Sequence, residues 1–312
     1  MMDHAIELQS PPAWRQPPAI AAIILWLAGL GVLASNPNPN LQLPLASGVL
    51  FGGLFSWLAF RLTRNVTRPI LKVLDPPRSL MIQGAYLLIF STVVLGWGLG
   101  VIADLTLSER ERALVVGAIK IVTMALIPLL LLRIGGDAIA PLFRSGMSRR
   151  RLIGLAVAFS CIFLVVIALV TPSVSLLQRL QPTVTQAVVG TAITLIWVAF
   201  TAGVTEEVMF RGLLQTRLEA VLSSAAAVVV IGAVAFAMAH VPGLYLRGDQ
   251  AAMMGVPVTL PNAIAYAITV LGPPGVFFGI LWMRTRSLAL LIVVHSAIDV
   301  LPNVPEIIEL WL

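Results

Sequence analysis

The sequence predicts an all-α fold: a polytopic bundle of transmembrane helices with about eight or nine spans and a cytoplasmic N-terminus. Composition is the first observation, because 59% of the 312 residues are hydrophobic and only 11% are charged, whereas soluble domains carry about 25% charged residues. Second, apolar windows close to the roughly 20 residues that cross a bilayer recur along the whole chain. Third, every second connecting loop is basic. A chain in lipid must satisfy its own backbone hydrogen bonds, so each span is expected to be helical.

Nine apolar windows lie between charged or Pro-, Gly- and Asn-rich breaks, and each predicts one helix. They are roughly 18–34, 44–60, 79–103, 113–132, 152–171, 185–205, 221–240, 262–282 and 287–301. The first two windows and the last are short, so one of them could instead form a re-entrant segment or a tilted helix. Residues 185–240 are expected to form an antiparallel helical hairpin that turns near 220–224.

The connecting loops indicate which side faces the cytoplasm. Loops 61–78 and 133–151 each carry five basic residues against one aspartate, and Arg211, Arg217, Arg284 and Arg286 continue the series. The intervening loops at 35–43, 104–112, 172–184 and 241–261 are neutral or balanced. Basic loops stay on the cytoplasmic side, so the N-terminus is expected there too. The same rule accounts for the net charge of +6, and no nucleic-acid partner is expected.

The predicted organisation has three parts. Residues 1–17 are Pro-rich without the basic start of a signal peptide, which predicts a cytoplasmic tail. Residues 18–184 form N-terminal transmembrane helices without an assigned role, and 185–312 form a transmembrane core. Cys161 is the only cysteine, so no intrachain disulfide can form. Compact loops rich in Arg and Ala favour a multi-pass protein of a bacterial inner membrane, with the lipid bilayer as its surroundings and an unknown oligomeric state.

Ionisable residues inside the predicted spans are the candidate functional residues, because they are costly in lipid and usually face a protein interior or a cavity. Glu206 and Glu207 follow the apolar run "AVVGTAITLIWVAFTAG", His240 ends another run, and His295 lies inside a third. Two simpler interpretations are a solvated helix end and a mutually satisfied buried pair.

Spacing favours one cluster over these interpretations. Glu207 and Arg211 are four residues apart, as are His295 and Asp299, so each pair shares a helix face. Across the predicted hairpin, Glu206 and His240 stand within about one turn of the same depth. His295 lies about 13 Å inward from the cytoplasmic end of its helix. If the hairpin tip projects into the cytoplasm, all of them converge in the inner half of the bilayer.

These residue types suit amide hydrolysis without a covalent intermediate. A carboxylate and a histidine that share a water molecule can activate it as a nucleophile. A second histidine with a polar neighbour can donate hydrogen bonds to the developing oxyanion. Arg211 would hold Glu207 ionised and oriented. No H-E-x-x-H or G-x-S-x-G motif is present, but zinc held by Glu206, His240 and His295 stays open as an alternative to a site without cofactors.

Three motifs in this order resemble the CPBP family of intramembrane glutamic proteases, which includes CAAX prenyl proteases and bacterial proteins of the bacteriocin-processing and abortive-infection (Abi) type. They are "EEVMFR" (E-E-x-x-x-R), "FAMAH" (F-x-x-x-H) and "HSAID" (H-x-x-x-[N/D]), within roughly residues 185–303. The resemblance implies that Glu206 and His240 activate the water, that His295 and position 299 form the oxyanion hole, and that Glu207 and Arg211 support the site.

One position departs from the eukaryotic CAAX proteases, which carry Asn where this chain carries Asp299. An ionised Asp offers no hydrogen-bond donor, so it must be protonated or must orient His295 as an acceptor. The expected function is an endopeptidase acting near the cytoplasmic leaflet on a peptide or membrane-protein segment, lipid-modified or not. The alternatives are a non-catalytic immunity or scaffold protein of the same fold and a proton-coupled transporter.

Overall fold

Nine long apolar helices make up the computed structural model, which describes residues 16–64, 71–247 and 255–312. No strand occurs in these ranges. By length and composition, nine helices of the described chain can cross a membrane. The prediction of an all-α polytopic bundle is confirmed. The predicted cytoplasmic tail, residues 1–17, lies outside the described residues except for its last two.

Five of the nine spans contain π-helical stretches, labelled η, between their α-helical parts. In chain order the spans are α1 (Pro17–Ala34); α2 (Gln42–Ser47), η2 (Gly48–Phe55) and α3 (Ser56–Leu62); α4 (Pro76–Ile89), η3 (Phe90–Gly98) and α5 (Leu99–Ala103); α6 (Glu109–Ile121), η4 (Val122–Leu126) and α7 (Ile127–Ile134); α8 (Arg149–Val170); α10 (Val184–Val198), η6 (Ala199–Val204), η7 (Glu207–Gln215) and α11 (Thr216–Val221); α12 (Ala225–Leu246); α14 (Leu260–Tyr266), η8 (Ala267–Leu271) and α15 (Gly272–Thr285); and α16 (Leu288–Trp311). The short helices η5 (Ala140–Phe143) and α9 (Ser173–Leu180) lie between spans.

Two boundaries differ substantially from the prediction. The sixth span does not end at 205 but continues to Val221, because its charged residues are buried in the protein rather than solvated. The last span does not end at 301: α16 runs to Trp311 with Pro302 and Pro305 inside it. Prolines are tolerated in membrane helices where neighbouring groups satisfy the freed backbone. The carbonyls that lose a donor are those of Ile298 and Leu301, four residues before each proline. The Asn303 side chain donates separately to the Asp299 carbonyl at 2.7 Å.

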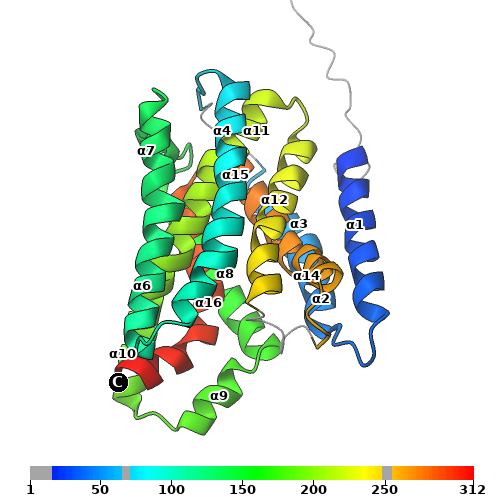
Figure 1. The fold of residues 1–312 in the computed structure, drawn as a ribbon. Helices are drawn as coiled ribbons and strands as arrows, with labels where there is room; N and C mark the ends of the chain where they lie inside the picture. The colour runs from blue at the N-terminus through cyan, green and yellow to red at the C-terminus, as the bar shows by residue number, and fades with distance from the viewer. Residues whose placement is uncertain (1–15, 65–70, 248–254) are drawn as a thin grey trace, which may run out of the picture.

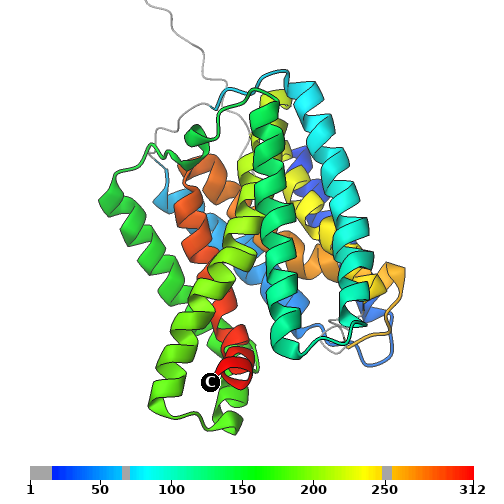
Figure 2. The same ribbon diagram turned by 60° about the vertical axis from the view of Figure 1, so that its left-hand side comes forward.

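The predicted hairpin is present, with its turn between Val221 and Ala225. Figures 1 and 2 show this turn at the same end of the bundle as the start of α4 and the end of α7. Within the bundle, α12 packs against α15, and α16 packs against α8 and α10. The C-terminus lies beside the start of α10, where Gln186 Nε2 donates to the Leu312 carbonyl at 3.5 Å. The second half of the chain thereby surrounds α16 on several sides.

Two ion pairs, one of them buried, fix the hairpin to its neighbours at the basic end. Arg217 Nη2 lies 3.0 Å from Asp137 Oδ2, and its Nε donates to Ser79 Oγ at 2.8 Å. Glu219 pairs with Arg286 at the turn between α15 and α16. These contacts connect the sixth span to three other segments of the chain.

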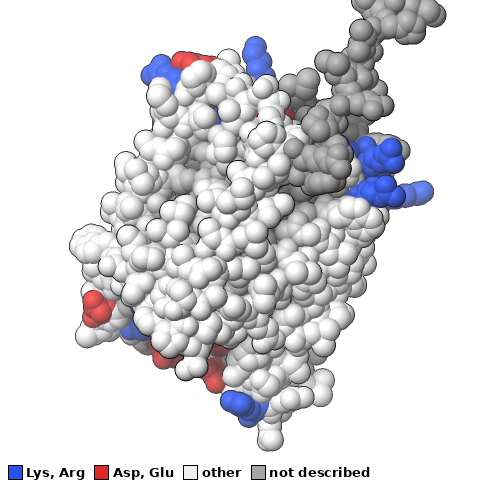
Figure 3. All heavy atoms as spheres, turned by 90° about the vertical axis from the view of Figure 1, so that its right-hand side faces the viewer, with Lys and Arg blue, Asp and Glu red and all other residues white. Residues whose placement is uncertain are grey.

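Charged side chains gather at the two ends of the molecule, as one face shows in Figure 3, and the band between them is formed by other residues. Large apolar side chains of several spans are exposed, such as Leu88, Leu169 and Val184. An exposed apolar belt between two charged ends is the surface expected of a bundle in lipid. Arg211 is an exception to the predicted basic series: it is buried inside the bundle rather than placed at the cytoplasmic edge.

Candidate functional site

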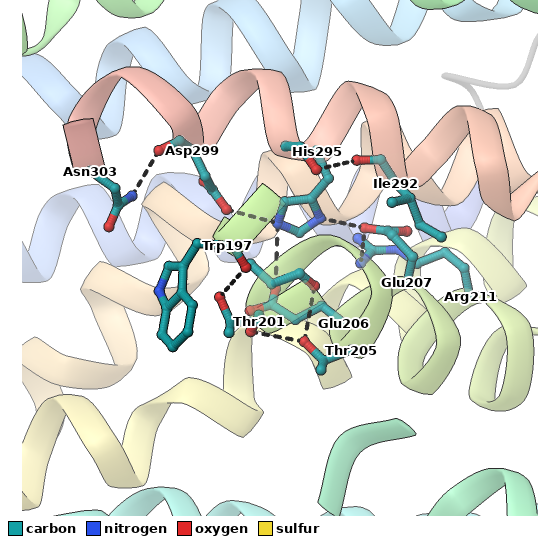
Figure 4. A network of polar contacts seen from close by, with 12 residues as sticks. Trp197, Thr201, Thr205, Glu206, Glu207, Arg211, Ile292, His295, Asp299 and Asn303 are labelled. Atoms are coloured by element: carbon teal, nitrogen blue, oxygen red, sulfur yellow. Dashed lines mark hydrogen bonds and ion pairs between the residues drawn. The ribbon is translucent and has the colours of Figure 1, made fainter. Parts of the chain in front are cut away.

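Glu206 and Glu207 stand at the junction of two π-helical segments, η6 and η7. Such segments widen a helix locally and occur often at functional sites. Figure 4 shows both acids approaching the ring of His295, which comes from α16. Glu207 Oε1 lies 2.6 Å from His295 Nδ1, and Glu206 Oε2 lies 3.7 Å from Nε2. One imidazole is therefore held between two neighbouring carboxylates.

Glu207 is also the partner of Arg211, as the spacing predicts. Arg211 Nη1 lies 3.2 Å from Glu207 Oε1, and the two side chains are 2% and 0% exposed. The Arg211 guanidinium carbon lies 4.6 Å from the ring centroid of Phe236 and 5.2 Å from that of Phe278. A guanidinium over an aromatic face is stabilised by the ring quadrupole. The pair is thus enclosed in protein and fixes the orientation of the His295 ring.

Asp299 lies on the other side of His295. Its Oδ2 is 3.4 Å from His295 Nε2, which is the acceptor arrangement considered for this position from the sequence. Phe278 stacks on the His295 ring with centroids 5.1 Å apart and an interplanar angle of 27°. The ring is therefore restrained on both nitrogens and on one face.

His240 has a defined hydrogen-bonding role. Its Nδ1 lies 2.8 Å from the Phe236 carbonyl oxygen. A carbonyl only accepts, so we assign the proton to Nδ1. In the neutral ring Nε2 then carries a lone pair, which can accept a hydrogen bond from a water molecule.

A cavity of about 250 Å³ joins these groups. Glu206, His240, His295 and Asp299 all line it, together with Phe236 and Phe278. Glu207 and Arg211 do not line the cavity and lie behind His295. The structure therefore brings the six candidate residues together and divides them into four that line the cavity and two that lie behind His295.

Residue counts give the depth of this cavity below the Glu219–Arg286 pair at the basic end. His295 follows Arg286 by nine residues, about 13 Å along α16. Glu206 precedes Glu219 by thirteen residues, about 20 Å for an α-helix, and π-helical turns shorten this figure. The site therefore lies about 13 to 20 Å from this pair along the two helices, and its position in the inner half of the bilayer stays a prediction.

Close contact between the sixth span and α16 sets the distance from Glu206 to His295. A Cβ atom added to Gly203 would lie 3.0 Å from Ser296 Oγ and 3.1 Å from the Ile292 carbonyl oxygen. Gly203→Val is therefore expected to push the two helices apart. If the site cleaves peptides, as the sequence predicts, the cleavage rate is expected to fall by about 10²-fold, the loss typical of a 1 Å misplacement of a reacting group. Peptide cleavage by the purified variant measures this. The control is Gly84→Ala, where no atom lies within 4 Å of the added Cβ; equal activity of both variants would contradict the expectation.

Lys120 is a charged neighbour of the site that the sequence did not identify. It lies inside the fourth span, on α6. One turn earlier on α6, Gly117 faces Trp197 and Thr201 of the span that carries Glu206. The signal in the sequence is a lysine in the middle of an apolar window, which is rare and costly. Phe278 and Arg247 also line the cavity, and no motif in the sequence marked either of them.

Metal binding is tested by the arrangement of possible ligands. In the described ranges, no group of three or more His, Cys, Asp or Glu side chains is placed to hold a metal ion. The zinc alternative at Glu206, His240 and His295 therefore gains no support from the side-chain geometry.

The sequence of this region matches one known family. Residues 188–301 match the family model described as Type II CAAX prenyl endopeptidase Rce1-like. The match spans all six candidate residues and most of the hairpin and helices that position them. No curated protein and no solved structure shows significant similarity to the chain.

Proposed function

Because residues 188–301 form a domain of the Rce1-like type II CAAX prenyl endopeptidase family, a family of proteases, we propose that this protein is an intramembrane endopeptidase whose water nucleophile is activated by Glu206 and His240. One observation carries the proposal. Glu206, His240, His295 and Asp299, from three different spans, line a single cavity inside a membrane-spanning bundle. Such a cavity can admit a peptide while excluding bulk water.

The proposed reaction begins with the attack of water on the peptide carbonyl and ends with the breaking of the C–N bond. Glu206 accepts one proton of the water molecule. The second O–H of the water donates a hydrogen bond to the lone pair on His240 Nε2, which orients the water. The water oxygen bonds to the carbonyl carbon, and the carbonyl oxygen becomes an oxyanion. Glu206 then returns the proton to the amide nitrogen as the C–N bond breaks. The products are a carboxylic acid and an amine, and no covalent enzyme intermediate forms.

His295 is the proposed donor to the oxyanion. Its Nδ1 donates to Glu207, whose negative charge is balanced by Arg211. Its Nε2 points toward the carboxylates of Glu206 and Asp299, so a proton on Nε2 is attracted to both. In this imidazolium form Nε2–H is a charge-assisted donor inside the cavity. Asp299 is then a hydrogen-bond acceptor that orients the His295 ring. The oxyanion needs no donor from position 299.

The proposed substrate is a peptide or a membrane-protein segment, with lipid-modified tails included. The bacterial inner membrane and the cytoplasmic side of the basic loops remain predictions from composition and charge. The division into N-terminal spans at 18–184 and a catalytic core at 185–312 also remains a prediction. Within this division, the ion pair of Arg217 with Asp137 joins the two parts.

Cleavage of a peptide library by the purified protein in proteoliposomes tests the proposal. We expect cuts in a subset of peptides and unchanged activity in EDTA or phenanthroline, because the proposed base and donor are side chains. Loss of activity in phenanthroline that zinc restores would establish the metal alternative instead. A preparation that is folded but cuts no peptide and no membrane-protein substrate would contradict the proposed function and favour the scaffold or transporter.

A further inference from the structure

The cavity is closed on the side that faces the basic end. Residues 205–218 of the sixth span, which lead from Glu206 to the basic end, are buried without a break. Between Val184 and Val204 the same span alternates buried and exposed positions. A buried hydrogen bond from Gln215 Nε2 to the Gly279 carbonyl at 2.9 Å joins the buried stretch to α15. The span is therefore enclosed by protein from Glu206 toward the basic end.

The neighbouring helices close the same side of the cavity. Phe236 and Phe278 line its inner end, and the Arg211 guanidinium lies against both rings. Beyond these rings, a Cβ added to Gly279 would lie 3.2 Å from Val229 Cγ1, so α12 and α15 are in close contact. In the described chain, the residues that lead from Phe236 and Phe278 to the basic end do not line the cavity.

The other lining residues extend toward the opposite end of the bundle, where α12 and α16 finish (Figures 1 and 2). They are Gly243, Leu244 and Arg247 after His240 on α12, Ile298 and Asp299 after His295 on α16, and Leu271 and Pro274 before Phe278 on η8 and α15. From His240 to the last of them on α12 the helix rises about 10 Å. This is the length of about three residues of an extended peptide.

Exposure increases in the same direction. The His295 side chain is 9% exposed, whereas that of Asp299, one helical turn further from the basic end, is 32% exposed. A half-exposed carboxylate inside a membrane-spanning bundle is typical of a residue that faces a water-filled cavity. The cavity therefore opens on the side of Asp299 and is packed on the side of Arg211.

We propose that the substrate chain enters the cavity from the end of the bundle opposite the basic end. This inference rests on the proposed function and adds the direction of entry to it. If the basic loops are cytoplasmic, as their charge predicts, the substrates are segments of membrane or exported proteins on the extracytoplasmic side. A cytoplasmic tail would instead meet the packed side of the site.

Cleavage by protein of known orientation tests the direction of entry. Cys161 is replaced by serine, and one cysteine is introduced at an exposed position, either Arg150→Cys at the start of α8 or Gln178→Cys in α9 at the opposite end. A membrane-impermeant thiol reagent then gives the fraction of each orientation in sealed proteoliposomes. A peptide that the protein cuts in detergent, extended by a polar tag that cannot cross the bilayer, is added outside. Its cleavage is expected to follow the fraction with Gln178→Cys outward.

Thiol labelling inside the cavity tests the opening without a substrate. Ile298→Cys, in the chain with Cys161→Ser, places a thiol between His295 and Asp299 on the cavity lining. The impermeant reagent is expected to label it from the end that carries α9 and not from the basic end. The matched control is Leu214→Cys in the buried stretch, which is expected to resist the reagent from both ends.

Three results would overturn the direction of entry and leave the protease intact. They are cleavage that follows the fraction with Arg150→Cys outward, labelling of Ile298→Cys from the basic end, and its failure to be labelled from either end of a folded protein. Absence of any Glu206-dependent cleavage in detergent, where both ends are accessible, would overturn the proposed function and substrate entry with it.

Discussion

Glu206→Gln is expected to abolish peptide cleavage, with a loss of about 10²- to 10⁴-fold or more in kcat, because an amide cannot accept a proton from the attacking water. The fold is expected to persist. Glutamine has the same shape as glutamate, and the Glu206 carboxylate faces the cavity, where water can solvate an amide. Single-turnover cleavage of a susceptible peptide and thermal unfolding in detergent measure the two effects separately.

A matched control is Glu309→Gln, which changes an exposed acid near the end of α16. It is expected to leave both activity and thermal stability unchanged. Cleavage by Glu206→Gln at the wild-type rate would show that another group is the base. If the wild type cuts no peptide but supports proton-linked uptake that Glu206→Gln removes, the chain is a transporter.

Glu207→Leu is expected to cause the largest loss of stability, about 3–5 kcal/mol, because it leaves the Arg211 guanidinium buried without its counter-charge. The same change removes the acceptor of His295 Nδ1, so the ring is no longer held toward the cavity. We expect a lower unfolding temperature and no cleavage. Thermal unfolding followed by circular dichroism, together with the peptide assay, measures both.

The double variant Glu207→Leu/Arg211→Met separates these two consequences. It removes both charges, and replacing a whole buried ion pair by apolar groups is often neutral or stabilising. We therefore expect most of the lost stability to return while activity stays absent, since His295 still lacks its acceptor. A double variant as unstable as Glu207→Leu would contradict the ion-pair explanation, and a double variant with restored cleavage would contradict the orienting role of Glu207.

Much of the fold follows from the sequence because lipid restricts the chain to few solutions. Each apolar window had to become a helix to satisfy its backbone, and the described part of the chain contains nine such helices. Local spacing also predicted the pairs Glu207–Arg211 and His295–Asp299, since residues four apart share a helix face. The hairpin turn near 220–224 followed from the polar break between two apolar runs. Helix ends depend on tertiary contacts: the sequence predicts an end before Pro302, yet α16 continues because its second half packs against α10.

Only the tertiary structure decided how the helix faces are turned toward one another. Periodicity gives the depth of His295 and the helix face on which it lies. It does not predict that Glu207 of another helix contacts its Nδ1 or that Phe278 stacks on its ring. Those contacts depend on how closely neighbouring helices approach, as at Gly203 against Ser296. For the same reason Arg247, a loop cation by sequence, lies in the cavity. The residues "EEVMFR" marked the candidate groups of the site, and packing decided that Glu206 faces the cavity while Glu207 is buried behind His295.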